Sequence, residues 1–359
     1  MMRKKDVHAD AVLGRISQLL PFTLINPENA EEIKKRFLKR AYEPEFAYGE
    51  KPDLTYAKEE LENLRFTKTV YGKLLEQEKE HLQAKIAMVE AIGTPLFGQH
   101  SKAVYGLPSK ELIEEAKEFL KLTKTTKGKN VPYKEVHALM KETFKLLGFK
   151  YSLRRANIVA SAFVSHTKRQ VQLKKKARFS HSFAYRLAVH EIATHALRAE
   201  NAREHQLGIF RRGTPNYLST EEGLAAYNEE RAGVMNTNIL RTYAGRVIAV
   251  HLSQTHTFVE TYKELRKHFS KEEAFTLTLR AKRGLDNGES RGGCSKDYAY
   301  LDGYLRVKAY AAAGEDLKEL YKAKIALEDL ELLAKKLPEP KYIPEPVIEW
   351  VRQQHLTQA

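Results

Sequence analysis

Two histidines five residues apart constrain this chain most, because they fall in a stretch whose apolar spacing predicts a helix, His190-Glu191-Ile192-Ala193-Thr194-His195. On a regular α-helix, at about 100° per residue, such a pair points about 140° apart. A single π-type turn would bring both rings onto one face, and such turns occur often at functional sites. If His190 and His195 bind one metal ion, the sequence therefore predicts a helix that is locally widened between them.

Two imidazoles and a neighbouring carboxylate are the side chains that catalytic zinc sites use. The better-known spacing is H-E-x-x-H, one residue shorter than the spacing here. With 13 histidines in the chain, the six-residue pattern has a chance of roughly a few per cent of arising at random. A buried helix with two core histidines and a surface glutamate is the alternative, and these six residues leave both interpretations open.

A candidate for the third ligand follows in Thr220-Glu221-Glu222-Gly223-Leu224-Ala225-Ala226. We expect this segment to open a long helix that runs from about Thr220 into the 250s. Two antiparallel helices joined by a loop would set Glu222 against both histidines. The alternative is simple N-terminal capping, since a threonine followed by acids suits the first turn of a helix.

Together, the H-E-I-x-T-H and E-G-L-A segments resemble a metallopeptidase family that includes the microtubule-associated tyrosine carboxypeptidases and bacterial proteins named after a Q-E-G-L-A motif. The resemblance extends over roughly residues 20–310. Further matching blocks are Asn26-Pro27 with Arg36-Phe37-Leu38 and Pro44-Glu45-Phe46-Ala47-Tyr48; Gly93-Thr94-Pro95 with Ser101 and Tyr105-Gly106-Leu107-Pro108; and Arg283-Gly284-Leu285 with Lys296-Asp297-Tyr298-Ala299-Tyr300-Leu301-Asp302-Gly303. Glu221 departs from the bacterial motif, which has Gln there, and we expect metal binding to survive this change.

The resemblance implies that His190, His195 and Glu222 are zinc ligands and that Glu191 is the general base. Zinc-activated water would attack a peptide carbonyl, and Glu191 would take its proton and pass it to the leaving amine. The family implies removal of a C-terminal tyrosine. The predicted function is a zinc metallo-carboxypeptidase acting on acidic tails, which would be tubulin-like in a eukaryotic setting.

Such an enzyme also needs a donor for the oxyanion and a cation for the terminal carboxylate. Tyr298 and Tyr300 are candidates for contacts at the reacting group, with Tyr300 taken as catalytic and Tyr298 as substrate-binding. Arg280, Arg283 and Lys296 are candidates for the carboxylate, and Arg283 is favoured because Arg has the bidentate geometry. The alternatives are core aromatic residues and a solvated basic face.

The positive charge of the chain is concentrated in one region. There are 61 Lys and Arg against 46 Asp and Glu, a net charge of +15, and the residues from Thr143 to His190 include no acid. That stretch carries eleven basic residues and two predicted strands, Ile158–Val164 and Gln170–Leu173, joined by a turn at His166–Arg169. A basic edge strand beside the metal helix would attract an acidic peptide. The alternatives are a basic edge that blocks aggregation and a nucleic-acid surface.

The expected fold is mainly α with a small β-sheet (α+β). The predicted domains are an N-terminal helical region (1–149), a zincin-like catalytic core (150–312) and a C-terminal helical extension (313–359), with both sets of flanking helices packed on the core. Helices are expected at Thr67–Ile92, from Pro132 to Leu147, at Lys296–Ala312 and at Asp316–Lys336.

No apolar run approaches the roughly 20 residues that a membrane span needs, and no membrane partner is expected. The single cysteine, Cys294, excludes an intrachain disulfide and favours a cytoplasmic setting. A nucleic-acid-binding protein and a non-catalytic interaction protein are the alternative functions. The first has no support beyond charge, so we do not expect nucleic acid as a partner.

Overall fold

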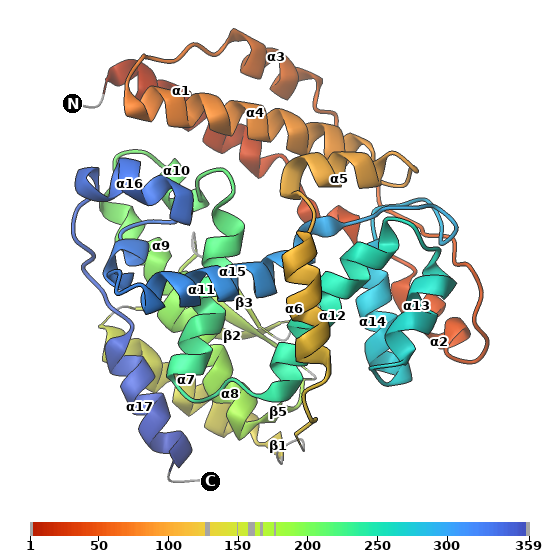
Figure 1. Ribbon diagram of the computed structural model, residues 1–359. Helices are drawn as coiled ribbons and strands as arrows, with labels where there is room; N and C mark the ends of the chain where they lie inside the picture. Colours follow the sequence, from red (N-terminus) through yellow and green to blue (C-terminus); the bar gives the residue numbers. More distant parts are fainter. Residues whose placement is uncertain are drawn as a thin grey trace. The chain divides into compact units, whose positions relative to one another are not determined.

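The computed structural model describes residues 3–125, 130–148, 150–156, 162–165, 168–175 and 177–356. The chain forms two compact units (Figure 1): the first comprises Met1–Thr123 and Ile239–Asp302, and the second Lys124–Asn238 and Gly303–Ala359. Both are mainly helical, and the second carries two small sheets. This confirms the expected mixture of helices with a small amount of sheet. The predicted core of 150–312 draws on both units, and as a functional division it stays a prediction.

The first unit consists of helices from two separate parts of the chain. Its elements are α1 (Lys4–Gln18), η1 (Phe22–Ile25), α2 (Ala30–Phe37), α3 (Thr55–Asn63), α4 (Val70–Glu90), α5 (Phe97–Tyr105), α6 (Lys110–Leu120), most of α12 (Thr237–Ser253), α13 (Phe258–Arg266), α14 (Lys271–Lys282), η4 (Ser295–Tyr298) and the start of α15 (Ala299–Ala312). The long helix predicted at Thr67–Ile92 is α4, capped by the Thr69 hydroxyl, which accepts a hydrogen bond from the Gly72 amide at 3.1 Å.

The second unit contains every described strand. Its elements are β1 (Asn130–Val131), α7 (Tyr133–Leu147), β2 (Ser152–Ala156), β3 (Ala162–Ser165), β4 (Gln170–Lys174), β5 (Phe179–Ser180), α8 (His181–Leu187), η2 (Ala188–Ala196), α9 (Leu197–Asn201), η3 (Ala202–Glu204), α10 (Ile209–Arg212), α11 (Tyr217–Arg231), the rest of α15, η5 (Leu317–Tyr321), η6 (Leu327–Asp329), α16 (Leu330–Leu333), η7 (Ala334–Lys336) and α17 (Glu345–Leu356). Helix α7 confirms the predicted helix after Pro132, and Gly148 ends it in the left-handed conformation that favours glycine.

The larger sheet has the order β2-β4-β3, with β2 parallel and β3 antiparallel to β4. Strand β4 confirms the predicted strand Gln170–Leu173, and β3 includes the last part of Ile158–Val164, whose residues 158–161 lie outside the described residues, as do 166 and 167 of the predicted turn. Strand β2 was missed by the sequence analysis. Its sequence, SLRRA, is polar and largely exposed, so hydrophobic alternation gives no signal there.

Two predicted helices are wrong. The single long helix from about Thr220 into the 250s is two helices, α11 and α12, because Gly233 takes a φ of 74° and breaks the run. The helix predicted over Asp316–Lys336 is a series of short turns (η5, η6, α16 and η7).

Segment η2 occupies the middle of the second unit. It contacts α7, α8, α9, α11, α17 and β3, and seven of its nine residues are buried. The larger sheet, through β3, and the surrounding helices thus fix its position by contacts on several sides. In the described parts of the chain, no helix is both long enough and apolar enough to cross a membrane.

Candidate metal centre

The helix that carries the two histidines is widened where the spacing predicts it. Segment η2, Ala188–Ala196, is a π-helix, and at its end the Leu197 amide donates to the Ile192 carbonyl, five residues back. His190 and His195, also five residues apart, therefore lie on one face, with ring centroids 4.8 Å apart and planes at 87°. The predicted π-type turn is confirmed.

A buried side-chain network supports the widened turn. The Thr194 hydroxyl donates to the Val189 carbonyl, five residues earlier, at 3.0 Å. The Asn228 amide of α11 donates to that hydroxyl at 2.9 Å and lies 2.5 Å from the Tyr321 hydroxyl. Thr194 and Asn228 are both fully buried, so these hydrogen bonds are not exchanged with water. The network joins the π turn to the helix that supplies the third side chain.

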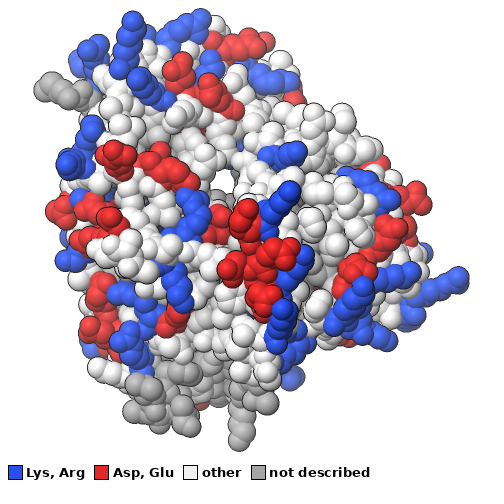
Figure 2. Space-filling model, viewed as in Figure 1, with Lys and Arg blue, Asp and Glu red and all other residues white. Residues whose placement is uncertain are grey.

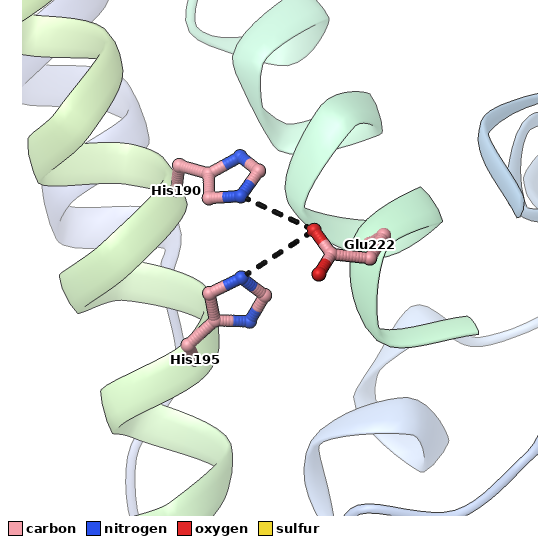
Figure 3. Close-up of side chains that lie close together, drawn as sticks. All are labelled: His190, His195 and Glu222. Carbon is pink, nitrogen blue, oxygen red and sulfur yellow. Dashed lines mark ion pairs between the residues drawn. The ribbon is translucent and has the colours of Figure 1, made fainter. Parts of the chain in front are cut away.

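That third side chain is Glu222, which projects from α11 towards both rings (Figure 3). Its Oε2 atom lies 3.5 Å from His190 Nε2 and 3.8 Å from His195 Nε2. One ligand atom from each residue lies within 4.8 Å of the other two. Ligands bound at about 2.1 Å in a tetrahedral site lie about 3.4 Å apart, so the two short separations suit a single zinc-sized ion.

Each histidine holds a carboxylate with its other ring nitrogen. His190 Nδ1 lies 2.6 Å from Glu229 Oε1, and His195 Nδ1 lies 2.8 Å from Glu221 Oε1. A proton on each Nδ1, donated to its carboxylate, leaves both Nε2 lone pairs directed at Glu222. This is the arrangement that orients histidine ligands in metal sites and raises their basicity.

Buried cations stabilise the carboxylate of Glu221. Lys324 Nζ lies 2.9 Å from Oε1, and the Arg198 guanidinium donates to Oε2. Burial alone would raise the pKa of Glu221, but Lys324 and then Arg198 hold that pKa well below its usual range. The partner of His195 is therefore a permanent anion near neutral pH.

Glu229 is held in the same way. It is fully buried, and Arg186 Nε lies 2.8 Å from its Oε2 atom. Burial raises the pKa of Glu229, whereas Arg186 and the hydrogen bond with His190 lower it, and the net shift is downward. Both histidines thus have an ionised carboxylate behind them.

Two glycines set how closely the backbones approach beside Glu222. A Cβ atom on Gly223 would lie 2.1 Å from the carbonyl carbon of Gly303 in α15, and one on Gly303 would lie 1.7 Å from the carbonyl oxygen of Ser219. Neither separation leaves room for a Cβ atom, so the close backbone contact requires glycine in the E-G-L-A segment. This contact sets the distance between the backbones of α11 and α15, and with it the position of Glu222.

The capping interpretation of Thr220, Glu221 and Glu222 is wrong. Helix α11 begins at Tyr217 after the N-cap residue Asn216, so Thr220 is not the cap, and Glu221 and Glu222 lie beyond the first turn, which has no acid. The Thr220 hydroxyl instead accepts a hydrogen bond from the Leu327 amide at 2.9 Å. Both acids are thereby available to the histidines.

Of the remaining site residues of the sequence analysis, Glu191 lies between the two histidines in the chain, and the others lie far from the triad in sequence. Glu191 is in η2 and half-buried. Tyr298, Tyr300, Arg280, Arg283 and Lys296 belong to the first unit. Tyr298 donates to the Tyr105 carbonyl at 2.5 Å, and the Tyr300 ring stacks on Tyr243. The catalytic and substrate-binding roles of these residues stay predictions.

Sequence reasoning missed the carboxylates behind the histidines and their cations. Glu229 follows Glu222 by seven residues, two helical turns, so it lies on the same face of α11, and that spacing could have pointed to it. Arg198 follows His195 by three residues and could have been found in the same way. Lys324 lies 103 positions from Glu221, and no local pattern connects them.

Comparisons with known proteins give a family match and similar solved structures. The sequence profile of the family described as "Microtubule-associated tyrosine carboxypeptidase" matches residues 35–358. No curated protein matches. Two solved structures are similar: one described as "the putative lipoprotein from Colwellia psychrerythraea", with a TM-score of 0.44, 10% identity and coverage of 84% of this chain and 66% of that one; and one named BsuCP, with a TM-score of 0.34, 12% identity and coverage of 99% and 97%. At these scores the two structures carry no argument about function.

Proposed function

Because the chain belongs to the microtubule-associated tyrosine carboxypeptidase family, we propose that it is a zinc-dependent carboxypeptidase that removes a C-terminal tyrosine from acidic peptide or protein tails. The observation that supports this most is the convergence of His190, His195 and Glu222 at separations of 3.5 and 3.8 Å between the imidazoles and the carboxylate. The microtubule association in the family's name points to tubulin tails, which are acidic, as the protein substrate, and to a cytoplasmic setting.

The three side chains suit zinc. Two imidazole nitrogens and one carboxylate oxygen are a common ligand set for catalytic zinc, which keeps a further position for water or substrate. Both imidazoles have the carboxylate partner that fixes them with Nε2 as the ligand atom. When bound, zinc supplies Lewis acidity, which lowers the pKa of water to about 7 and polarises a carbonyl group.

The chain's own residues then carry the proton transfers. Glu191 follows His190 directly and is half-buried, so its carboxylate is accessible to water. We propose that this carboxylate accepts the proton of the attacking water and returns it to the nitrogen of the leaving tyrosine. Tyr300 is proposed to donate a hydrogen bond to the oxyanion, and Arg280, Arg283, Lys296 and Tyr298 to contact the substrate.

An acidic substrate agrees with the charge of the sheet whose strand β3 contacts η2. Strand β3 is an edge of the three-stranded sheet and contacts η2, so its outer side offers a place for an extended peptide to pair. Strand β2 at the other edge carries the exposed side chains of Arg154 and Arg155. We propose that this basic sheet attracts the acidic tail and increases the rate of encounter at low salt.

A general nucleic-acid-binding role receives no comparable support. Figure 2 shows basic and acidic side chains interspersed on the face drawn, whereas binding to a phosphate backbone uses a continuous basic surface. Binding that falls steeply with salt and is unaffected by a chelator would favour that alternative.

The test is mass spectrometry of acidic peptides ending in Tyr, Phe, Ala and Glu, with and without a zinc chelator, on protein of measured metal content. We expect about one zinc per chain, loss of only the last residue, preference for Tyr, and full inhibition by the chelator. Glu191→Gln should abolish cleavage and keep the zinc, whereas His195→Ala should lose both. Protein without stoichiometric zinc would contradict the metal assignment, and cleavage inside the peptide would contradict the carboxypeptidase assignment while leaving the zinc.

A further inference from the structure

A buried carboxylate joins the larger sheet to the helix that continues from the metal segment, all within the second unit. Helix α9 follows η2 without a break, and Glu200 lies near its end, with a side chain that is 4% exposed. Arg169 donates to both oxygens of this carboxylate, from Nη2 to Oε2 at 2.8 Å and from Nε to Oε1 at 3.2 Å. This bidentate pairing fixes the orientation of the two groups as well as their distance.

Glu200 also binds two other side chains. The Tyr151 hydroxyl and Arg203 Nε both donate to Oε1, at 3.0 and 2.7 Å. Burial would raise the pKa of Glu200, but the hydrogen bonds from Arg169, Arg203 and Tyr151 lower it, and the net shift is downward. The carboxylate is therefore an anion near neutral pH, and its charge is available to the guanidinium of Arg169.

Arg169 directly precedes β4, the central strand of the larger sheet. Its carbonyl accepts a hydrogen bond from the Ser152 amide of β2 at 2.8 Å, and the next residue, Gln170, pairs with Ser165 of β3. Arg169 takes a φ of 44°, in the left-handed region that residues other than glycine rarely adopt. The pair with Glu200 and the hydrogen bond from Ser152 offset the cost of this conformation at the point where the three strands meet.

The position of β3 against the metal segment depends on this anchor. Strand β3 contacts η2, with Ala162 and Val164 buried and Phe163 52% exposed on the other face. A shift of one residue in its pairing with β4 would exchange the two faces of the strand. Glu200 fixes the start of β4 to α9, and β4 in turn fixes β3 by register, so the carboxylate sets where this edge strand lies along the helix that carries the histidines.

We propose that Glu200 and Arg169 are positioning residues that hold β3 in the register at which a bound peptide presents its last peptide bond to the metal centre. The inference rests on the proposed function, in which the outer side of β3 pairs with the substrate. Neither side chain has to touch the peptide, because both act through the backbone of β4. Sequence analysis gave no reason to connect the two residues, which lie 31 positions apart.

Replacing the two residues separates positioning from simple attraction of charge. Glu200→Gln makes the chain more positive by one unit, and Arg169→Gln makes it less positive by one unit. Electrostatic attraction alone would therefore tighten the binding of an acidic peptide in the first variant and weaken it in the second. Positioning predicts that both variants bind about 10-fold more weakly and that the double variant binds no worse than either, since the pair acts as one unit.

Binding is measured by fluorescence anisotropy with an N-terminally labelled acidic peptide ending in tyrosine, on zinc-loaded protein carrying Glu191→Gln to prevent cleavage. Peptides with one backbone amide methylated at a time report on strand pairing, because every second amide of a paired strand donates to its neighbour. With Glu200 and Arg169 present, methylation at alternate positions should weaken binding about 10-fold. In Glu200→Gln and in Arg169→Gln this alternation should disappear, while the zinc content stays at one per chain.

Arg203→Gln is the matched control, since it removes a donor from the same carboxylate but lies in η3, outside the sheet, and it should keep both the affinity and the alternation. Affinities that move in opposite directions in Glu200→Gln and Arg169→Gln would overturn the proposal, as would alternation that persists in both. No binding or no alternation with both residues present would overturn it without either variant, so a folding defect in Glu200→Gln cannot obscure the result. Alternation that depends on the pair, in protein that retains Glu191 and zinc but never cleaves the peptide, would remove the proposed function and keep the role of the pair in placing the peptide.

Discussion

Replacing Gly223 with alanine tests whether backbone contact controls the metal centre. The new Cβ atom would lie 2.1, 2.2 and 2.5 Å from the carbonyl carbon, carbonyl oxygen and Cα of Gly303. Ordinary van der Waals contact begins near 3.4 Å, so the two helices have to separate by roughly 1.3 Å. Because the obstacle is backbone rather than a flexible side chain, rotation of a side chain cannot relieve it.

The displacement should reach the metal site, since Glu222 is the adjacent residue. Zinc–oxygen bonds are about 2.0–2.2 Å, and functional sites tolerate deviations of about 0.2 Å. Even a quarter of the required separation exceeds that tolerance. We expect Gly223→Ala to weaken zinc binding by at least about 100-fold, equivalent to about 2.7 kcal/mol, and to lower the free energy of unfolding by about 1–3 kcal/mol.

Competition with a chromophoric zinc chelator measures the affinity, and urea unfolding measures the stability. Gly303→Ala should weaken zinc in the same way, because its Cβ meets the Ser219 carbonyl oxygen in α11. Gly245→Ala is the control: the atoms nearest its Cβ would be side-chain atoms of Phe269 and Leu277, at 2.6–2.9 Å, and these can move. That variant should lose some stability and keep its zinc affinity. A folded Gly223→Ala protein with wild-type zinc affinity would refute the reasoning.

Three further perturbations test the surroundings of the site and the stability of the first unit. Thr194→Val removes the hydroxyl that bonds to the Val189 carbonyl and to Asn228, so zinc affinity should fall about 10-fold and the unfolding free energy by about 1–3 kcal/mol. Thr194→Ser keeps the hydroxyl and should keep both values. Equal values for the Val and Ser variants would exclude a role for the hydroxyl. Glu221→Gln leaves the buried cations Arg198 and Lys324 without their carboxylate. The free energy of unfolding in urea should fall by about 3–5 kcal/mol and the zinc affinity by about 10- to 100-fold. An unchanged stability would contradict the charge balance inferred for Glu221. Burial lowers the pKa of His81 to about 3, below its unfolded value of about 6.5, so its contribution to stability is present above pH 6.5 and is lost as the pH falls. At pH 5 the loss should be up to about 2 kcal/mol, so the unfolding free energy of the wild type minus that of His81→Leu should fall by that amount between pH 7 and pH 5.

The part of the site that the sequence could predict is the part that geometry makes necessary. Two imidazoles five residues apart cannot share one ion on a regular α-helix, so the spacing predicted a π turn on the condition that both bind one metal ion. Glu222 needed the family resemblance, because its sequence neighbourhood also reads as a helix cap. Gly223 could be seen in the sequence, but the need for glycine at that position could not. It comes from contact with Gly303, eighty positions later, which is a property of the fold.

The errors in the fold have a common cause: local patterns do not report on tertiary contacts. Strand β2 has no hydrophobic alternation, and it forms because β4 supplies the hydrogen bonds of a parallel pair. The apolar spacing of Asp316–Lys336 suggests a helix, yet the carbonyl groups of Leu320, Ala323 and Ile325 all accept hydrogen bonds from Arg198. A continuous helix would use those carbonyls internally, so the buried guanidinium favours the irregular path.

That irregular segment makes the C-terminal region part of the metal centre. The same Arg198 guanidinium that binds three of its carbonyls also binds Glu221, and Lys324 of the segment reaches Glu221 as well. Glu221 in turn holds His195. The orientation of a proposed zinc ligand therefore depends on residues more than a hundred positions away, through two buried cations rather than through packing of an accessory helix. Because a buried carboxylate without its cations would take up a proton and release the imidazole, loss of this segment should impair the metal site before it impairs the helices that carry it.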